Sequence, residues 1–205
     1  SRIIQSKCED FNVSKADGDK VLFTSDARLR YLTDDNDIRV TPMSRYALGQ
    51  LGSKLGVPVR YLEKCIDTGK LDLAQDNVNS WIDDFNKDLF IREYNGRIRG
   101  ILSSKYTVCD TPDILQVVSD VVDLNNYNVK GSFLNEERLH LRLVQKDMLH
   151  IDGEDLFAGL TIDSSDVGRS ILNCNFIIYK QVCTNGLILA KGGGTLFQQK
   201  HIGIC

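Results

Sequence analysis

The hydrophobic positions of this chain change their period near residue 89, and the change predicts two kinds of structure. Between residues 41 and 88 the apolar residues recur every three or four positions, as on one face of an amphipathic helix. From residue 89 onward most apolar stretches are short and several alternate with polar residues, as along a half-buried strand. The pattern therefore predicts helices first and a run of strands later.

Start and stop signals divide the first region into three predicted helices. The first begins at Thr41-Pro42, a hydroxyl N-cap followed by proline at the first helical position, and ends before Gly56. The second covers residues 58–69 and the third residues 76–88. In the third helix Trp81 falls on the apolar face, so we expect it to anchor the core.

The first two predicted helices, with a glycine at the turn, resemble a helix-turn-helix in length. An ordinary helical hairpin has the same pattern. The second helix offers only Arg60 and Lys64 as cations and also carries Glu63 and Asp67. This balance favours the plain hairpin over a helix that enters a DNA groove.

The second region begins with a predicted β-hairpin. Residues 89–94 and 97–102 flank Asn95-Gly96, a two-residue loop of the kind that type I′ turns require, because both central residues need positive φ. Arg97 and Arg99 alternate with Ile98, so both guanidinium groups are expected on the same face of the sheet.

A further helix and more strands follow the hairpin. Asp110-Thr111-Pro112 repeats the cap-plus-proline signal, and the helix after it carries a wide apolar stripe that we expect to be buried. Strands are predicted over Tyr127 to Leu134, Arg138 to Val144, Leu156 to Ile162 and Asn175 to Cys183.

This order of elements predicts an α+β fold, with an antiparallel sheet and helices packed on one of its faces. Residues 1–40 are weakly patterned apart from a short strand at Val21 to Thr24, and we interpret them as an N-terminal arm or edge hairpin. Residues 41–205 are expected to form a single α+β domain.

Composition narrows the class of protein. The 205 residues are 42% hydrophobic, enough for a sizeable core, yet there is no run of 18 apolar residues to span a membrane. The first residues lack the apolar region of a signal peptide, and the six cysteines contain no CxxC pair. We therefore expect a cytoplasmic protein with reduced thiols, no membrane association, no metal and no cofactor.

The net charge of −3 argues against a strongly basic nucleic-acid binder, but acidic residues cluster in a few places and leave room for a local basic face. Cations beside aromatic rings are the usual means of holding single-stranded nucleic acid. The alternative is a solvated sheet face with core tyrosines. The candidate nucleic-acid-binding residues are Arg92, Arg97, Arg99, Lys105, Tyr106, Arg138, Arg142 and Lys180.

No motif predicts catalysis. Residues 192–194 are three glycines that lack the flanking residues of a phosphate-binding loop and are interpreted as a flexible turn or loop. Asp163 and Asp166 suit backbone capping in a turn better than acid–base chemistry, and Cys183 is expected to be a buried strand cysteine rather than a nucleophile paired with His201.

Four short blocks carry a resemblance to known proteins: Gly100 to Tyr106 with Asp110, Asp163 to Gly168, Tyr179 to Gly186 and Lys200 to Gly203. They resemble a family that occurs in phages and plasmids, filed as domain of unknown function 932. This resemblance implies a phage or plasmid protein acting in the cytoplasm of a bacterial host. The order of strands also resembles, in architecture alone, the β-β-β-α core of single-strand annealing recombination proteins.

These observations lead to three hypotheses. The first is a non-enzymatic protein that binds single-stranded DNA in replication or recombination, as a homo-oligomer and alongside host or phage replication and recombination proteins. The second is a protein-interaction or anti-defence module that engages a host protein, which the acidic balance favours. The third is a metal-dependent nuclease, for which Asp110, Asp163 and Asp166 are the carboxylates to inspect.

Overall fold

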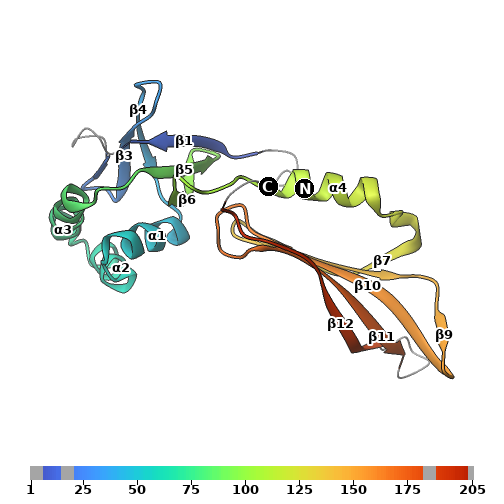
Figure 1. Ribbon diagram of the computed structural model, residues 1–205. Helices are drawn as coiled ribbons and strands as arrows, with labels where there is room; N and C mark the ends of the chain where they lie inside the picture. The colour runs from blue at the N-terminus through green and yellow to red at the C-terminus, as the bar shows by residue number, and fades with distance from the viewer. Residues whose placement is uncertain (1–6, 15–20, 182–187, 203–205) are drawn as a thin grey trace. The chain divides into compact units, whose positions relative to one another are not determined.

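The computed structural model describes residues 7–14, 21–181 and 188–202 and divides the chain into two compact units (Figure 1). We call residues 7–106 the N-terminal unit and the described residues from Thr107 onward the C-terminal unit. Both contain antiparallel sheets and helices, so the fold is α+β as predicted. The expected boundary after residue 40 is not where the chain divides.

Two three-stranded antiparallel sheets make up the strands of the N-terminal unit. The side chains of Phe23, Leu29 and Tyr31 are almost completely buried and share one core with the helices that follow. The segment expected to be an arm is therefore an integral part of this unit. In sheet order, the strands are β1 (Glu9–Val13), β5 (Leu89–Tyr94) and β6 (Arg97–Ser103), and then β2 (Val21–Phe23), β3 (Arg28–Leu32) and β4 (Ile38–Pro42).

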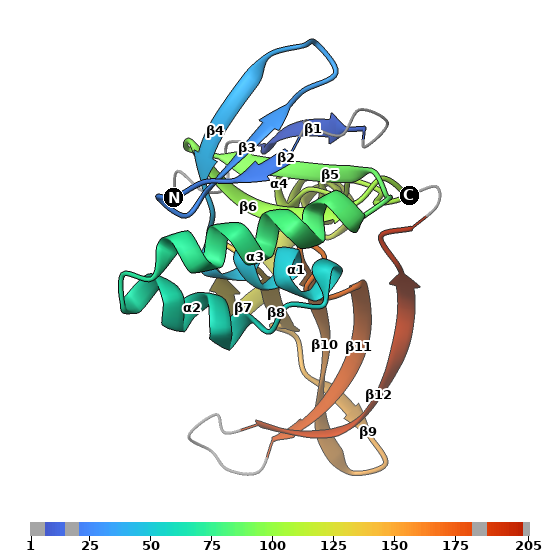
Figure 2. The ribbon, with the colours of Figure 1, turned by 90° about the vertical axis from the view of Figure 1, so that its left-hand side faces the viewer.

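Three helices complete the N-terminal unit, and α1 packs against β6 (Figure 2). They are α1 (Arg45–Leu55), α2 (Val59–Asp67) and α3 (Leu71–Asp84). The cap of α1 is Ser44, whose Oγ accepts a hydrogen bond of 3.0 Å from the N–H of Ala47. The predicted start at Thr41-Pro42 is wrong, because both residues pair with β3 as the end of β4. The predicted stop at Gly56 is confirmed, with a left-handed φ of 72°.

Trp81 on α3 is not the core anchor that the sequence predicts, since it is 52% exposed. The inward face of α3 is fixed instead by Asn79, whose amide exchanges hydrogen bonds of 2.7 and 2.9 Å with the backbone of Phe23 on β2. Two residues further along a helix the side chain points about 200° away, on the opposite side. Trp81 is therefore directed outward, while Val78 and Ile82 are buried.

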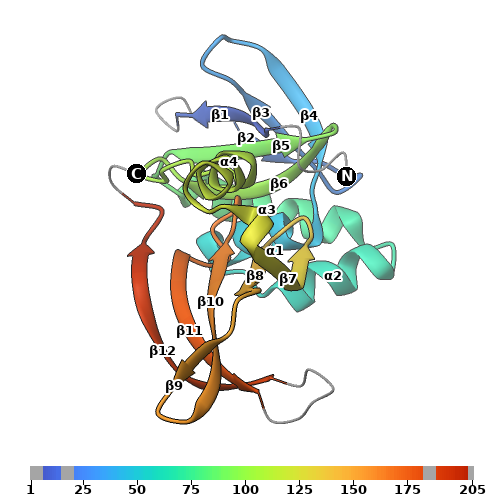
Figure 3. The same ribbon diagram turned by 90° about the vertical axis from the view of Figure 1, so that its right-hand side faces the viewer.

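The C-terminal unit is one antiparallel sheet with a helix, α4 (Thr111–Val121), packed on one face. A short 3-10 turn, η2 (Leu124–Asn126), leads from the helix into the sheet. The strand order is β12-β11-β10-β8-β7, and β9 pairs with the first three residues of β10. Figure 3 shows the pronounced curvature of the longest strands. The strands are β7 (Tyr127–Leu134), β8 (Leu139–Gln145), β9 (Leu149–Ile151), β10 (Glu154–Ser164), β11 (Leu172–Gln181) and β12 (Ile188–Gln199).

The first turn of α4 is held by Asp166, which follows β10. Its Oδ1 accepts hydrogen bonds from the backbone N–H and the hydroxyl of Thr111, at 2.9 and 2.8 Å. Ile114 then packs on Leu139 and Ile162 of the sheet. The apolar stripe predicted for this helix is only partly buried, because Val117 and Val121 on its outer side are 61% and 78% exposed. The remaining apolar surface of α4 faces away from its own sheet.

The three glycines at residues 192–194 lie inside β12, not in the flexible loop that the sequence suggested. They pair with residues 176–178 of β11. A Cβ on Gly193 would lie 2.5 Å from the carbonyl oxygen of Phe176, so the two strands approach each other too closely there for a side chain. No helix in the described part of the chain is long and apolar enough to cross a membrane.

Candidate nucleic-acid interface

The predicted hairpin of β5 and β6 is present, and its turn has the expected backbone, with φ of 52° at Asn95 and 67° at Gly96. The strand pairing shifts register beyond the turn, so that Arg99 is an extra, bulged residue in β6. Arg97 is exposed, whereas Arg99 is only 8% exposed and its guanidinium lies 5.7 Å from the ring centroid of Tyr94. The two arginines therefore have different environments, unlike the shared open face that alternation predicted.

Arg92 is completely buried in an ion pair within the N-terminal unit. Its Nε and Nη2 lie 2.7 and 3.1 Å from the two carboxylate oxygens of Asp10 on β1. Its guanidinium also lies 5.9 Å from the ring centroid of Tyr106, and that ring is itself stacked on Phe90. Neither Arg92 nor Tyr106 is thus placed to meet a phosphate or a base without rearrangement of this interior.

A buried carboxylate stands next to Arg92 in the strand. Glu93, 2% exposed, accepts a hydrogen bond from the hydroxyl of Tyr31 and lies 2.8 Å from Nη2 of Arg39. Burial, and then the hydrogen bond to Glu93, raise the pKa of Tyr31 well above its usual value. The hairpin is therefore part of a buried polar network, and of its predicted contact residues Arg97 and Lys105 are the exposed cations.

In the C-terminal unit, cross-strand pairing aligns polar residues in two neighbouring rows across five strands. Residues directly opposite each other share a face of a sheet, and so do residues two apart along a strand. We call this surface the polar face. Its first row is Gly131, Arg142, Thr161, Asn175 and Thr195, and its second row is Phe133, His140, Asp163, Asn173 and Gln198.

The polar face lies on the side of the sheet opposite α4. The helix packs against Leu139, Leu141 and Ile162, which alternate with the polar-face residues along β8 and β10. Position along each strand therefore separates an apolar side, partly covered by the helix, from a polar side. The polar side carries amides, hydroxyls, one arginine, a histidine with its paired aspartate, and the ring of Phe133.

Some polar-face groups bind one another and others do not. Nδ1 of His140 lies 2.8 Å from Oδ1 of Asp163, and Nδ2 of Asn175 donates to the hydroxyl of Thr161 at 3.4 Å. Within the described residues, Nε of Arg142 and Oδ1 of Asn173 are buried and have no hydrogen-bond partner. A donor and an acceptor on neighbouring rows are thus left unpaired within the described part of the unit.

An aromatic ring stands at one end of the second row. Phe133, on edge strand β7, is 52% exposed, although residues of this size and polarity are usually buried. Its direct cross-strand neighbour is His140. A flat exposed ring next to hydrogen-bonding groups can stack on a base.

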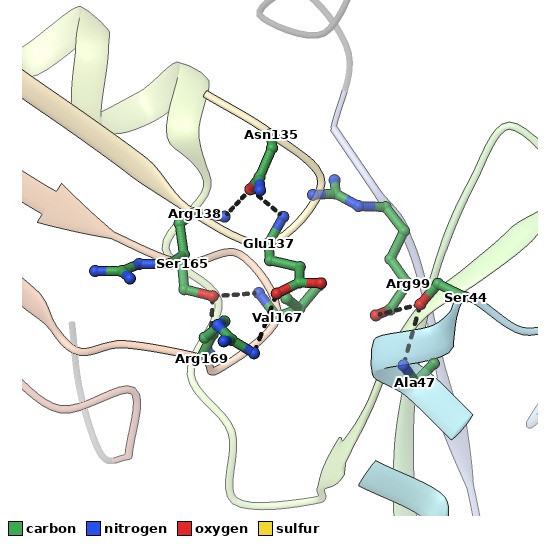
Figure 4. A network of polar contacts seen from close by, with 9 residues as sticks. All are labelled: Ser44, Ala47, Arg99, Asn135, Glu137, Arg138, Ser165, Val167 and Arg169. Atoms are coloured by element: carbon green, nitrogen blue, oxygen red, sulfur yellow. Dashed lines mark hydrogen bonds and ion pairs between the residues drawn. The ribbon is translucent and has the colours of Figure 1, made fainter. Parts of the chain in front are cut away.

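Arg138 comes just before β8, in a turn that is held by side-chain hydrogen bonds (Figure 4). Oδ1 of Asn135 accepts from the backbone N–H groups of Glu137 and Arg138, both at 2.8 Å. Glu137 forms an ion pair of 3.2 Å with Arg169, so that carboxylate is already matched by another cation. Arg138 is exposed beside this pair.

Lys180 lies on the other side of the sheet, because it pairs with Leu156 and alternates with the polar-face residues of β11. Its Nζ lies 2.8 Å from Oε1 of Glu154, which also accepts from Lys191. The hydrogen bonds from Lys180 and then Lys191 lower the pKa of Glu154 to about 2. The predicted cations therefore do not form one continuous track, and Lys180 is not part of the polar face.

The carboxylates considered for a nuclease are used elsewhere. Asp163 binds His140, Asp166 binds Thr111, and Asp110 is buried at the start of α4. Among the described residues no group of three His, Cys, Asp or Glu side chains is placed to hold a metal ion. Cys183, considered as a partner of His201, lies outside the described residues.

Charged residues alone do not reveal the neutral residues of the polar face. Asn173 and Asn175 alternate with apolar residues in β11, and Thr161 alternates with Leu160 and Ile162 in β10. That alternation was a usable signal, since it predicts one polar side shared by both strands. Comparison with known proteins adds no relative: no family model, no curated protein and no solved structure matches the chain.

Proposed function

We propose that the polar face of the C-terminal unit binds single-stranded nucleic acid. The observation that supports this most directly is the alignment of two polar rows beside the exposed ring of Phe133, with Arg142 in the adjacent row. Neighbouring strands lie about 5 Å apart, and residues two apart on a strand about 7 Å, so the rows offer contacts at the spacing of successive nucleotides.

The side chains suit unpaired bases. Asn and Gln amides form paired hydrogen bonds with base edges, and these edges are accessible when a strand is single and its bases are splayed. Asn173, Asn175 and Gln198 supply such amides, and Phe133 supplies a stacking surface. In a duplex the Watson–Crick edges are occupied, so we expect a preference for single strands.

The cations that remain available are few, and this shapes the expected affinity. Arg142 on the polar face and Arg138 next to it can contact phosphates, whereas Arg92, Arg99 and Lys180 are buried or paired. Each phosphate contact to a single strand contributes about 0.7 to the slope of log affinity against log salt. We therefore expect moderate salt dependence, with stacking and hydrogen bonds carrying much of the binding.

The proposed setting is phage or plasmid replication or recombination, in a bacterial cytoplasm and without catalysis by this chain. The phage or plasmid origin and the cytoplasm follow from the resemblance to domain of unknown function 932, and recombination follows from the likeness in strand order to single-strand annealing proteins. The absence of catalysis follows from the lack of a catalytic motif in the sequence, and all of these stay predictions. Exposed edge strands at both sides of the sheet, β7 and β12, are compatible with the expected homo-oligomer.

The test is fluorescence anisotropy with labelled oligonucleotides of about 20 nucleotides, single-stranded and duplex, titrated with the whole chain. Phe133→Ala is expected to weaken single-strand binding about tenfold, since stacking contributes about 1–3 kcal/mol per base. Arg142→Gln should weaken it as well and lower its salt dependence. Lys180→Gln, on the opposite side of the sheet, is the matched control and should bind like the unmodified chain.

Absence of binding to single strands, preference for the duplex, or equal effects of Phe133→Ala and Lys180→Gln would each contradict the proposal. Circular dichroism of each variant separates a binding defect from a folding defect.

A second function, interaction with a host protein, is favoured by apolar side chains exposed in the C-terminal unit. Val121 on α4 and Leu189 and Phe197 on β12 are 78%, 55% and 49% exposed. Such surface is typical of protein contacts. A stoichiometric protein captured from host lysate, together with no anisotropy change on any oligonucleotide, would favour this function over the first.

A further inference from the structure

The N-terminal unit contains a cavity of about 350 Å³ between the start of α1 and the end of α2. Ligand sites for small molecules usually measure about 300–1,000 Å³, so this cavity is at the lower end of that range. Its walls come from the first turn of α1, the last turn of α2, the β2–β3 turn and β6. It belongs wholly to the N-terminal unit and is separate from the polar face.

The charged side chains on the α1 and α2 side of the cavity are one arginine and two carboxylates. Arg45 forms an ion pair with Glu63, and Asp67 adds a second carboxylate close enough to raise the pKa of Arg45 together with Glu63. The hydrogen bond from Arg45 in turn lowers the pKa of Glu63. Arg60 also lowers the pKa of Glu63, so of the two lining carboxylates Asp67 is the one without an ion pair among the described residues.

Arg97 is the second cation of the cavity, and no carboxylate among the described residues forms an ion pair with it. In the described part of the chain its hydrogen bonding is limited to Nε, which donates to the carbonyl of Met43 at 3.3 Å. Both terminal nitrogens of its guanidinium are thus open toward a ligand. A guanidinium fork with two free nitrogens is suited to an anionic group with two or three oxygens.

The rest of the lining is apolar and firmly held. Met43 and Leu48 are 9% and 6% exposed, and Ala27 and Ile66 complete the apolar wall. Met43 bridges to Ile98 of β6, and the N–H of Ser44 donates to the carbonyl of Ile98 at 2.8 Å. The wall that would receive a ligand is therefore fixed to both a helix and a strand.

We propose that this cavity binds a nucleoside 5′-monophosphate group, either as a free nucleotide or as the 5′ end of a strand. The phosphate would bind the free end of Arg97. The ribose hydroxyls would donate to Asp67 and Glu63, and the base would lie against Met43, Leu48 and Ile66. A nucleotide carries its anionic group, its hydroxyls and its flat base in separate parts. The lining likewise keeps the arginine, the carboxylates and the apolar side chains in separate places.

A free amino acid fits less well, although it also combines charge with an apolar body. Its ammonium and carboxylate are attached to the same carbon atom, whereas Arg97 on β6 and Asp67 at the end of α2 come from different elements. An amino acid also provides no hydroxyl pair for the two carboxylates. It therefore serves as the competing ligand in the test.

The first measurement is isothermal titration of the whole chain with AMP, adenosine and leucine. AMP should bind at least about tenfold more tightly than adenosine, because an arginine–phosphate contact is a charge-assisted hydrogen bond. Arg97→Gln should abolish that difference, and Asp67→Asn should weaken both ligands. Lys105→Gln, an exposed cation of the same unit outside the cavity lining, is the control and should leave AMP binding unchanged.

Equal binding of AMP and adenosine, or binding of leucine without AMP, would overturn the proposal. The source of the nucleotide is decided with a trinucleotide that carries either a 5′-phosphate or a 5′-hydroxyl. Tighter binding of the phosphorylated trinucleotide than of AMP identifies a strand end, and the reverse order identifies a free nucleotide.

These measurements are repeated with Phe133→Ala. If the polar face does not bind nucleic acid, this variant behaves like the unmodified chain toward oligonucleotides, and the AMP result still decides the cavity. The two proposals can therefore fail separately.

Discussion

The β5–β6 hairpin and the polar face carry similar residue types but place them in opposite ways. In the hairpin Arg92 and Arg99 are buried, one against Asp10 and the other near Tyr94. On the polar face Arg142 keeps a buried Nε without a partner among the described residues. The comparison shows that an arginine at an alternating strand position can be buried against partners of its own unit, as Arg92 is against Asp10.

The physical reason is the free energy of desolvation. Moving a guanidinium out of water is unfavourable by several kcal/mol unless a well-placed carboxylate compensates it. Arg92 has such a partner at 2.7 Å, from a strand 82 residues earlier in the chain. Its role in the hairpin is therefore to fix the pairing of β1 with β5.

The largest effect that tests this contrast is expected for Arg92→Ala. The substitution leaves Asp10 without its partner and removes a fully buried side chain, so it should lower the free energy of unfolding by about 3–5 kcal/mol. Urea denaturation followed by circular dichroism measures the change. Arg138→Ala, at an exposed position of the C-terminal unit, should change stability by no more than about 0.5 kcal/mol. Similar losses of unfolding free energy for the two variants would contradict the contrast between the buried Arg92 and the exposed Arg138.

Gly193→Ala should have the next largest effect on stability. It acts on β12 and on its neighbour β11, the strand that carries Asn175 of the polar face. The new Cβ would lie 2.5 Å from the carbonyl oxygen of Phe176, so β11 and β12 must move apart, at a cost of about 1–3 kcal/mol. Thermal unfolding measures the loss. Gly192→Ala is the matched control, since a Cβ there meets nothing within 4 Å. Equal melting temperatures would show that the two strands separate more easily than this geometry indicates.

A smaller effect is expected in the salt dependence of oligonucleotide binding. Arg142→Gln should reduce the slope of log affinity against log salt by about 0.7, the contribution of one phosphate contact. Lys180→Gln should leave the slope unchanged, because Lys180 is already paired with Glu154 on the other side of the sheet. If Lys180→Gln changed the slope instead, the oligonucleotide would bind on the side of the sheet that carries Lys180.

The smallest predicted effect concerns pH. The pKa of Glu154 is lowered to about 2 by Lys180 and Lys191, so its ion pairs contribute fully above the ordinary carboxyl pKa near 4.5. That contribution should be lost as the pH falls from about 4.5 through about 2. NMR titration of the Glu154 carboxyl group measures the midpoint, and Lys180→Gln should raise it. A midpoint near 4.5 in the unmodified chain would mean that Lys180 is free for other contacts.

Local backbone signals in the sequence predicted this structure best. Asn95-Gly96 and Gly56 both have the positive φ expected of them, and the limits predicted for β7 agree with those observed. These features depend on a few adjacent residues, so the sequence contains all the information needed.

Features that depend on distant partners could not be predicted. Thr41 and Pro42 look like a helix start but pair with β3, and Trp81 looks buried until Asn79 fixes the other side of α3 to β2. The bulge at Arg99 arises from pairing with β5, and the alternation of polar and apolar residues along β6 does not reveal it. For the candidate site, the sequence supplied Arg138 and Arg142, while the alignment of the amides of β11 and β12 with Thr161 and Asp163 of β10 required the strand register.

The pairing of β1 with β5 also has a consequence for how the chain reaches its folded state. Residues 9–13 bind residues 89–93, so this strand pair closes a loop that contains all three helices of the unit. Closing long loops slows folding, because their entropy is lost before the distant contacts form. During synthesis Asp10 must wait for about eighty more residues before Arg92 leaves the ribosome. Until then the backbone N–H and C=O groups of the first strand lack their partner strand and can pair with another chain.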